Sequence, residues 1–136
     1  MIDVVMSIKP NFVKLIQEKK KNYEFRKYIP KLGIYRLWIY TTSPVCILEY
    51  VAEIDNIVEY PESVIGNGVG NEDFNNGLKK SKYAYHINHL YRLKKPIKLK
   101  HLREEYNFTA PQSYFYLENN LKLSELLLKQ ELERIF

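Results

Sequence analysis

The stretch Ser7–Arg26, S-I-K-P-N-F-V-K-L-I-Q-E-K-K-K-N-Y-E-F-R, decides the fold. It begins within an apolar run, Val4–Ile8, which predicts a short strand. Pro10 ends this strand and favours a helix after it, because the first helical turn does not use the N–H that proline lacks. The basic run Lys19–Lys21 suits the carboxyl end of such a helix, and Tyr23–Lys27 then alternates apolar and charged residues like a half-buried strand.

The apolar residues of this stretch predict which faces are buried. One face of the helix carries Phe12, Leu15 and Ile16. Successive strand residues point to opposite faces, so we expect Tyr23 and Phe25 to point inward and Glu24 and Arg26 outward. Two such charged residues on one face can simply form a surface salt bridge. Ligand binding is the alternative, and it accounts better for so many polar residues in one short stretch.

Length and composition indicate one domain inside the cell. A chain of 136 residues can bury an independent core, and it needs neither a disulfide nor a metal to fold. Cys46 is the only cysteine, which excludes an internal disulfide and fits a reducing compartment. The sequence shows no basic-then-apolar leader and no long apolar run. We therefore expect a soluble, cytoplasmic protein without a membrane partner.

Charge and aromatic content leave two interpretations open. The formal net charge is +5, and the basic residues gather in clusters, among them residues 19–21 and 92–100. Such clusters form a phosphate-attracting face, or they only solvate the surface of a lysine-rich protein. The 12 tyrosines suit base-stacking platforms, although most are expected to be packing residues.

The middle of the chain reads mostly as strands. Aromatic and β-branched runs predict strands at residues 34–42, 45–60, 83–93 and 108–117, the second of them bent and the third ended by Pro96. Short helices are expected at about residues 72–77, with Phe74 toward the core, and at residues 102–106.

The last residues predict an amphipathic helix. Ser124 is a plausible N-cap, and apolar residues follow at helical spacing as far as Ile135. We expect residues 119–136 to form a helical extension packed on a domain of residues 1–118. The leucines at positions 126–128 make a wide apolar band, which leaves a homodimer or a protein partner as the alternative to packing on the same domain.

Four short stretches, two of them within Ser7–Arg26, resemble the ASCH domain, a family of the PUA-like superfamily of small β-barrels. Ser7, Lys9 and Pro10 are similar to its S-x-K-P opening strand, and Lys21, Glu24 and Arg26 to its K-x-x-E-x-R element. Two later stretches also resemble the family, namely Tyr40-Thr41-Thr42-Ser43-Pro44 and Ala110-Pro111-Gln112-Ser113. The resemblance covers about residues 4–117 and implies an α+β fold, a small mostly β barrel with short flanking helices and a C-terminal helix.

The resemblance also implies a ligand site. In the family the matching Lys, Glu and Arg line a cleft between the helix and the barrel, beside the opening strand and the Ser-Pro turn. The implied binding residues are Ser7, Lys9, Lys21, Glu24, Arg26, Tyr40, Thr42, Ser43, Gln112 and Ser113. Lysines and arginine suit phosphate, a tyrosine suits stacking, and Glu24 and Gln112 suit the edge of a base.

RNA or nucleotide binding in this cleft is therefore the preferred function, and catalysis is an alternative. Some relatives of the family remove the acetyl group from N4-acetylcytidine with a Lys, a Thr and a Glu, but Glu24 stands where their threonine would be. Others are associated with ribonuclease activity, for which Lys21 and Glu24 would be an acid/base pair. A protein-interaction module working through the C-terminal helix is the third reading.

Other residues carry less chemistry. His86 and His89 are three apart, which on a strand points them to opposite faces and argues against a shared metal ion. The glycine-rich stretch 66–70 lacks the spacing of a phosphate-binding loop, and Cys46 lies in an apolar run as a packed thiol does. We therefore expect no metal site and no cofactor.

Overall fold

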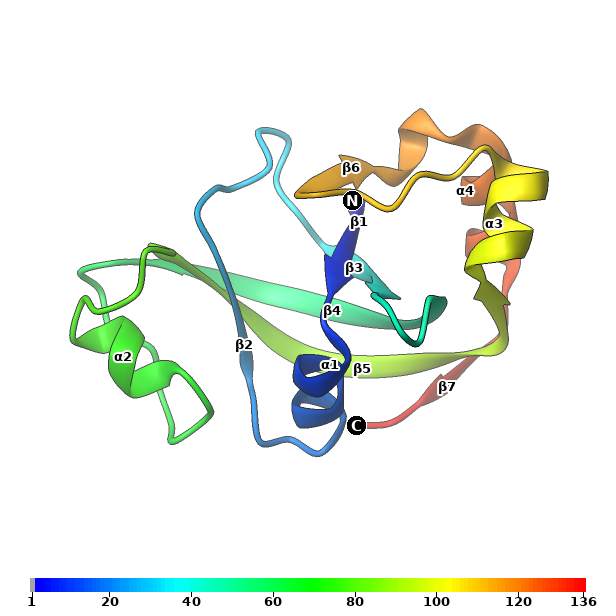
Figure 1. Cartoon of the computed structure of the whole chain (residues 1–136). Helices are drawn as coiled ribbons and strands as arrows, with labels where there is room; N and C mark the ends of the chain where they lie inside the picture. The colour runs from blue at the N-terminus through cyan, green and yellow to red at the C-terminus, as the bar shows by residue number, and fades with distance from the viewer. Residues whose placement is uncertain (1) are drawn as a thin grey trace.

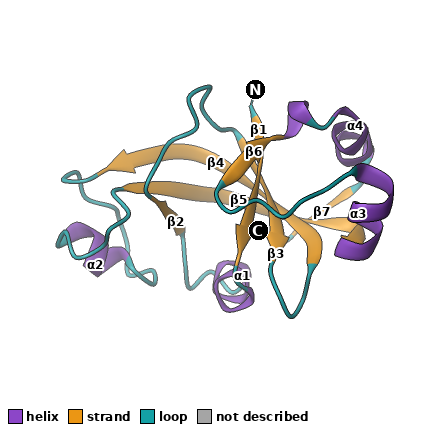
Figure 2. Ribbon diagram, turned by 45° about the horizontal axis from the view of Figure 1, so that its top comes forward, coloured by secondary structure: helices purple, strands orange, loops and turns teal. Residues whose placement is uncertain are grey.

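A single curled sheet organises the molecule (Figures 1 and 2). The computed structural model of the chain describes residues 2–136, and in them seven strands form one sheet. The strand order is β2-β5-β4-β3-β1-β6, and β7 pairs with β5 at residues 91–93, beyond the residues that pair with β2. The strands are β1 (Asp3–Ile8), β2 (Tyr23–Arg26), β3 (Arg36–Thr41), β4 (Ile47–Glu59), β5 (Tyr83–Lys98), β6 (Tyr114–Tyr116) and β7 (Leu132–Arg134). The β1–β3 pair is parallel and the others are antiparallel.

Four short helices lie around this sheet. They are α1 (Pro10–Gln17), α2 (Asn71–Asn75), α3 (Leu99–Tyr106) and α4 (Leu121–Lys129), and a 3₁₀ turn, η1 (Leu117–Asn119), precedes α4. Figure 1 shows α2 at one end of the long β4–β5 hairpin and α3 and α4 at the other end. Within residues 2–136 no helix has the length and apolar character that crossing a bilayer requires.

The bend predicted in the second long strand is confirmed. The pairing of β4 with β5 shifts register near Leu48, Glu53 and Ile54, and such bulges add local twist that curls a sheet. The prediction that Pro96 ends β5 is wrong, because β5 continues to Lys98. Proline is tolerated there since it falls in the irregular segment between two register pairs, Arg92–Tyr50 and Ile97–Leu48.

The opening of the fold follows the sequence closely, with one exception. The predicted strand, the helix that starts at Pro10 and the strand from Tyr23 are all present. The buried residues of α1 are Val13 and Ile16, whereas Phe12 is 37% exposed. The predicted helix face was therefore wrong for Phe12. The predicted closing strand at residues 108–117 is also shorter than expected, since only β6 pairs with β1.

Two clusters of buried side chains fill the two faces of the sheet. The first lies under α1 and includes Met6, Ile16, Leu37 and Tyr85. The second lies under α3 and α4 and includes Val5, Trp38, Tyr40, Leu48, Leu102, Leu123 and Leu127. Alternate residues of β1 and β3 go to opposite clusters, as the period of two in a strand requires.

The end of the chain differs from the expectation in two ways. Helix α4 begins earlier than predicted, since the side chain of Asn120, rather than Ser124, caps it by accepting a hydrogen bond from the Leu123 N–H. The helix also ends at Lys129, and the next residues form β7 instead of continuing as a helix to Ile135. The Gln130 side chain bonds the Lys95 backbone twice, which fixes the chain onto the edge of β5.

Candidate functional site

Strand β2 is covered on both faces. Tyr23 and Phe25 pack toward α2 through Phe74, as the sequence predicted for an inward face. Glu24 pairs in register with the fully buried Tyr85 of β5 and is itself only 6% exposed. The prediction that Glu24 points outward is therefore wrong. Glu24 lies on the face of β2 that meets the first cluster through Tyr85, and the α2 segment covers the opposite face, which carries Tyr23 and Phe25.

A chain of polar contacts starts at this buried carboxylate. Lys21 Nζ lies 3.3 Å from Glu24 Oε1, and Arg26 Nη2 lies 3.2 Å from Glu24 Oε2. The same arginine nitrogen donates to the Ser7 carbonyl at 3.0 Å, and the Ser7 hydroxyl donates to the Pro111 carbonyl at 2.8 Å. We call Lys21, Glu24, Arg26 and Ser7 the polar chain. It joins the segment between α1 and β2, strands β1 and β2, and the loop before β6.

Lys21 is the most unusual group in the polar chain. Its side chain is 4% exposed, and its Nζ also donates to the Tyr23 carbonyl at 2.5 Å. Burial lowers the pKa of Lys21 below its usual value of 10.5, the nearby Glu24 carboxylate opposes this, and the positive charges of Lys79 and Arg26 add to it. An amine with a lowered pKa beside a carboxylate is suited to proton transfer.

A cavity of about 170 Å³ opens beside this pair. We call it the cleft, and it is lined by Phe12, Lys21, Glu24, Phe25, Val69, Gly70, Lys79 and Ser81. The two lysine amines lie over one ring: Lys21 Nζ is 4.5 Å and Lys79 Nζ is 4.6 Å from the centroid of Phe25. The cleft therefore combines two cations, one carboxylate and aromatic surface.

A curated relative connects this arrangement to known proteins. An ASCH domain-containing ribonuclease of Zymomonas mobilis is 32% identical to the chain, and the match covers 95% of both proteins. This chain belongs to the ASCH domain family. A scan against profiles of protein families finds no match.

Solved ASCH structures agree with the fold. A tyrosine-to-phenylalanine variant of the ASCH protein from Zymomonas mobilis superposes with a TM-score of 0.72 at 27% identity, covering 95% of this chain and 99% of that one. The unsubstituted protein gives a TM-score of 0.66 at 27% identity, covering 95% and 96%. The α+β, mostly β, PUA-like fold expected of an ASCH domain is thereby confirmed.

The structure of this ASCH domain brings some of the ten expected site residues together and separates others. Ser7, Lys21, Glu24 and Arg26 form the polar chain, and Gln112 and Ser113 follow the Pro111 carbonyl that Ser7 bonds. Lys9 is exposed at the start of α1, Ser43 is exposed and Thr42 is half-buried. Of the ten expected residues, Lys21 and Glu24 are the two that line the cleft.

Tyr40 is not placed for the base-stacking role that was expected of it. Its side chain is 2% exposed and its ring packs against Phe108, with a centroid distance of 5.4 Å. Burial and a hydrogen bond with Cys46 raise the pKa of Tyr40 to about 12. Its ring faces the second cluster, so it would have to leave the core before it could stack on a base.

The sequence missed several residues of the cleft. Val69, Gly70, Lys79 and Ser81 come from the segment around α2, which lies between β4 and β5 in the chain and folds over β2. Lys79 belongs to a basic run that is visible in the sequence, and only the fold shows that its amine approaches the same Phe25 ring as the Lys21 amine.

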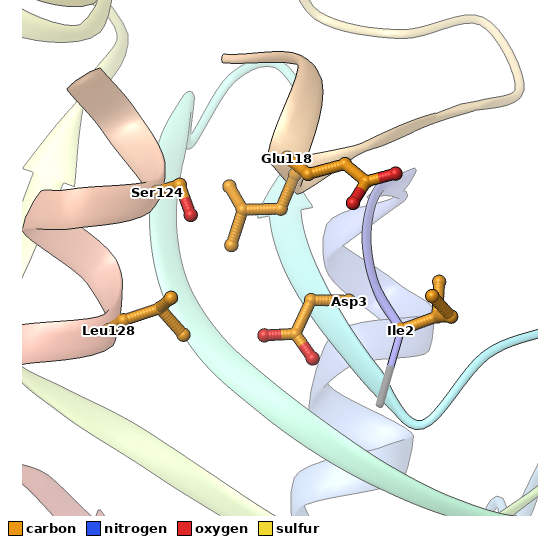
Figure 3. A pocket seen from close by; sticks show the side chains of 6 residues that line it. Ile2, Asp3, Glu118, Ser124 and Leu128 are labelled. Atoms are coloured by element: carbon orange, nitrogen blue, oxygen red, sulfur yellow. The ribbon is translucent and has the colours of Figure 1, made fainter. Parts of the chain in front are cut away.

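Other polar groups have separate, structural partners. In a smaller cavity of about 110 Å³ between β1, η1 and α4, Figure 3 shows Asp3 with Ser124 and Leu128 nearby. The Asp3 carboxylate is held by Arg36 at 2.8 Å and by the Trp38 indole at 3.1 Å. His86 contacts Asp55 at 2.7 Å. No group of three or more His, Cys, Asp and Glu side chains in residues 2–136 is placed to hold a metal ion.

Proposed function

We propose that this ASCH domain binds RNA at the cleft and cleaves it there with Lys21 and Glu24. The observation that carries the proposal is the buried ion pair, since a lysine and a carboxylate 3.3 Å apart open onto a cavity that contains a second cation. The name of the Zymomonas mobilis relative, a ribonuclease, supports RNA as the substrate. Without the cavity, the same pair would be an ordinary structural salt bridge.

The size of the cleft favours a polymer over a free nucleoside. Pockets that enclose a whole small ligand usually measure roughly 300–1,000 Å³. The cleft, at about 170 Å³, has room for one phosphate and part of a ribose. The remainder of the ligand must then lie along the surface, as a single RNA strand does.

In the proposed reaction the RNA supplies its own nucleophile. The ribose 2′-hydroxyl gives its proton to the Glu24 carboxylate and attacks phosphorus, forming the new P–O bond. The bond to the 5′-oxygen breaks, and the Lys21 ammonium donates a proton to that leaving oxygen. Glu24 then returns its proton to Lys21 across their 3.3 Å contact. The products are a 2′,3′-cyclic phosphate and a 5′-hydroxyl, and Arg26 keeps Glu24 in place through its 3.2 Å contact.

The first test compares an RNA oligonucleotide with the same sequence carrying a single 2′-deoxy nucleotide. We expect wild-type protein to cut the all-RNA strand and to leave the bond after the deoxy position intact, because that ribose lacks the nucleophile. Gel analysis with end-labelled strands measures both. Equal cutting at the deoxy position would contradict the proposed reaction, and no cutting of RNA at any position would contradict the proposed function.

The pH dependence gives a second test. Because Lys21 acts as an acid when protonated, the rate should fall as pH rises through its pKa, which burial places below 10.5. The Glu24 carboxylate raises the pKa of Lys21, so residual cleavage by Glu24→Gln should decline at a lower pH than in wild type. The profile of kcat/KM against pH measures this falling limb in wild type and in Glu24→Gln. A limb that stays in place in Glu24→Gln would show that another group is the acid.

Alternative roles have less support. The relatives that hydrolyse N4-acetylcytidine use a threonine where this chain has Glu24, so hydrolysis here would need a different route. A partner contact through α4 has Leu121 and Leu128 as its exposed apolar residues, while Leu123 and Leu127 are already buried in the core. Partner binding, a homodimer and a cytoplasmic location stay predictions. Sedimentation of the purified protein tests the dimer, which requires a mass of twice 16.3 kDa.

A further inference from the structure

Lys79 lines the cleft together with Lys21 and Glu24 of the polar chain. It lies in the connection between α2 and β5, and its amine is 4.6 Å from the centroid of the Phe25 ring. The Lys21 amine approaches the same ring at 4.5 Å. Two amines that share one ring come from chain segments that are more than fifty residues apart in the sequence. The fold therefore assembles this pair of cations.

The two cations differ in what balances their charge. Lys21 has the Glu24 carboxylate at 3.3 Å. Lys79 forms no ion pair within 4.0 Å among residues 2–136. Its positive charge nevertheless acts on Lys21, because it helps to lower the pKa of that lysine. Lys21, Arg26 and Lys79 against Glu24 leave this region with an excess of positive charge, which an anionic ligand would balance.

The neighbouring loop limits where the Lys79 side chain can go. Gly70 has a φ of +87°, a conformation that favours glycine, and a Cβ at this position would lie 3.0 Å from Lys79 Cε and 2.8 Å from a Phe25 ring carbon. The loop backbone thus packs directly against the lysine stem and the ring. A half-buried stem held in this way places the amine at the cleft, whereas a surface lysine would move freely.

We propose that Lys79 binds a backbone phosphate of the RNA in the cleft, which Ser81 also lines. This inference rests on the proposed function and makes it more specific. The substrate must carry a phosphate within reach of Lys79, so a nucleoside without phosphate is a poor ligand. Lys21 then acts at the phosphate that reacts, and Lys79 binds a second phosphate that does not react.

The test compares two adjacent lysines. Lys79→Gln and Lys80→Gln remove the same charge, but Lys80 is exposed and does not line the cleft. The probe is a 2′-O-methyl RNA hexamer, which lacks the free 2′-hydroxyl that the proposed reaction requires. For Lys79→Gln we expect affinity about tenfold lower and a salt slope reduced by about 0.7, the value for one phosphate on a single strand. For Lys80→Gln we expect affinity within about twofold of wild type, and Lys79→Arg should restore binding.

The outcomes separate this inference from the proposed function. Equal affinities and salt slopes for wild type and Lys79→Gln would overturn the role of Lys79, even if wild type cuts RNA and Glu24→Gln cuts it far more slowly. A loss shared equally by Lys79→Gln and Lys80→Gln would also overturn it, since it would show a diffuse effect of surface charge. Failure of wild type both to bind the hexamer and to cut RNA would overturn both proposals. Thermal melting of each variant checks that the fold is retained.

Discussion

Lys21→Met is expected to cut RNA about a thousandfold more slowly than wild type, within the range usual for a general acid/base residue. The fold should be kept. Burial lowers the pKa of Lys21, so its charge is less favourable in the folded state than in the unfolded chain. Replacing it by an apolar side chain of similar length removes that cost, and Arg26 still pairs with Glu24 at 3.2 Å. Initial rates and urea unfolding measure the two effects.

The sign of the stability effect follows from linkage. Between the lowered folded pKa of Lys21 and 10.5, the unfolded chain binds more protons than the folded one, so stability contributed by this group rises with pH. That rise should be absent in Lys21→Met. The matched control is Lys14→Met on the exposed side of α1, which should change neither rate nor pH dependence. A Lys21→Met protein that unfolds readily, or that cuts RNA normally, would mark Lys21 as a structural residue.

Glu24→Ala is expected to destabilise the protein strongly, by about 3 kcal/mol, because it leaves buried charge without a partner. Glu24 is 6% exposed and contacts both Lys21 and Arg26, so its loss removes the one carboxylate from two cations. Glu24→Gln keeps hydrogen-bonding capacity at this position and should fold better, while still losing cleavage. Urea unfolding of both variants measures the difference.

A surface ion pair provides the control for this experiment. Glu131 lies 3.1 Å from Lys94, and its side chain is 78% exposed. Exposed pairs of this kind add little to stability, so Glu131→Ala should unfold close to wild type. If Glu24→Ala were as stable as Glu131→Ala, the polar chain would not be the buried, tightly coupled group that the proposed mechanism requires.

The sequence predicted those parts of the fold that local patterns determine. Pro10 correctly marked the start of α1, and the alternation after Tyr23 correctly marked β2. It failed where distant segments decide the outcome. Glu24 is buried because its face of β2 lies beside the buried Tyr85 and is covered by Lys21 and Arg26, and Pro96 lies inside β5 because a bulge there needs no N–H. The C-terminal strand β7 forms only because β5 offers it an edge.

The same distinction applies to the site. Family resemblance selected Ser7, Lys21, Glu24 and Arg26, and these residues do contact one another. It also selected Tyr40, whose side chain the strand period directs into the core. Lys79 could not be selected, since no sequence rule places it beside Phe25. Two of the residues that the motifs selected, Lys21 and Glu24, line the cleft, and the fold was needed to find the lining residues contributed by the α2 segment.

The most direct test of the central claim is a crystal structure of the protein with the 2′-O-methyl RNA hexamer. We predict one phosphate within hydrogen-bonding distance of Lys21 and the next beside Lys79, with Glu24 facing the blocked 2′-oxygen. RNA bound instead over the lysines near α4, at Lys94, Lys95 and Lys129, with the cleft empty, would contradict it.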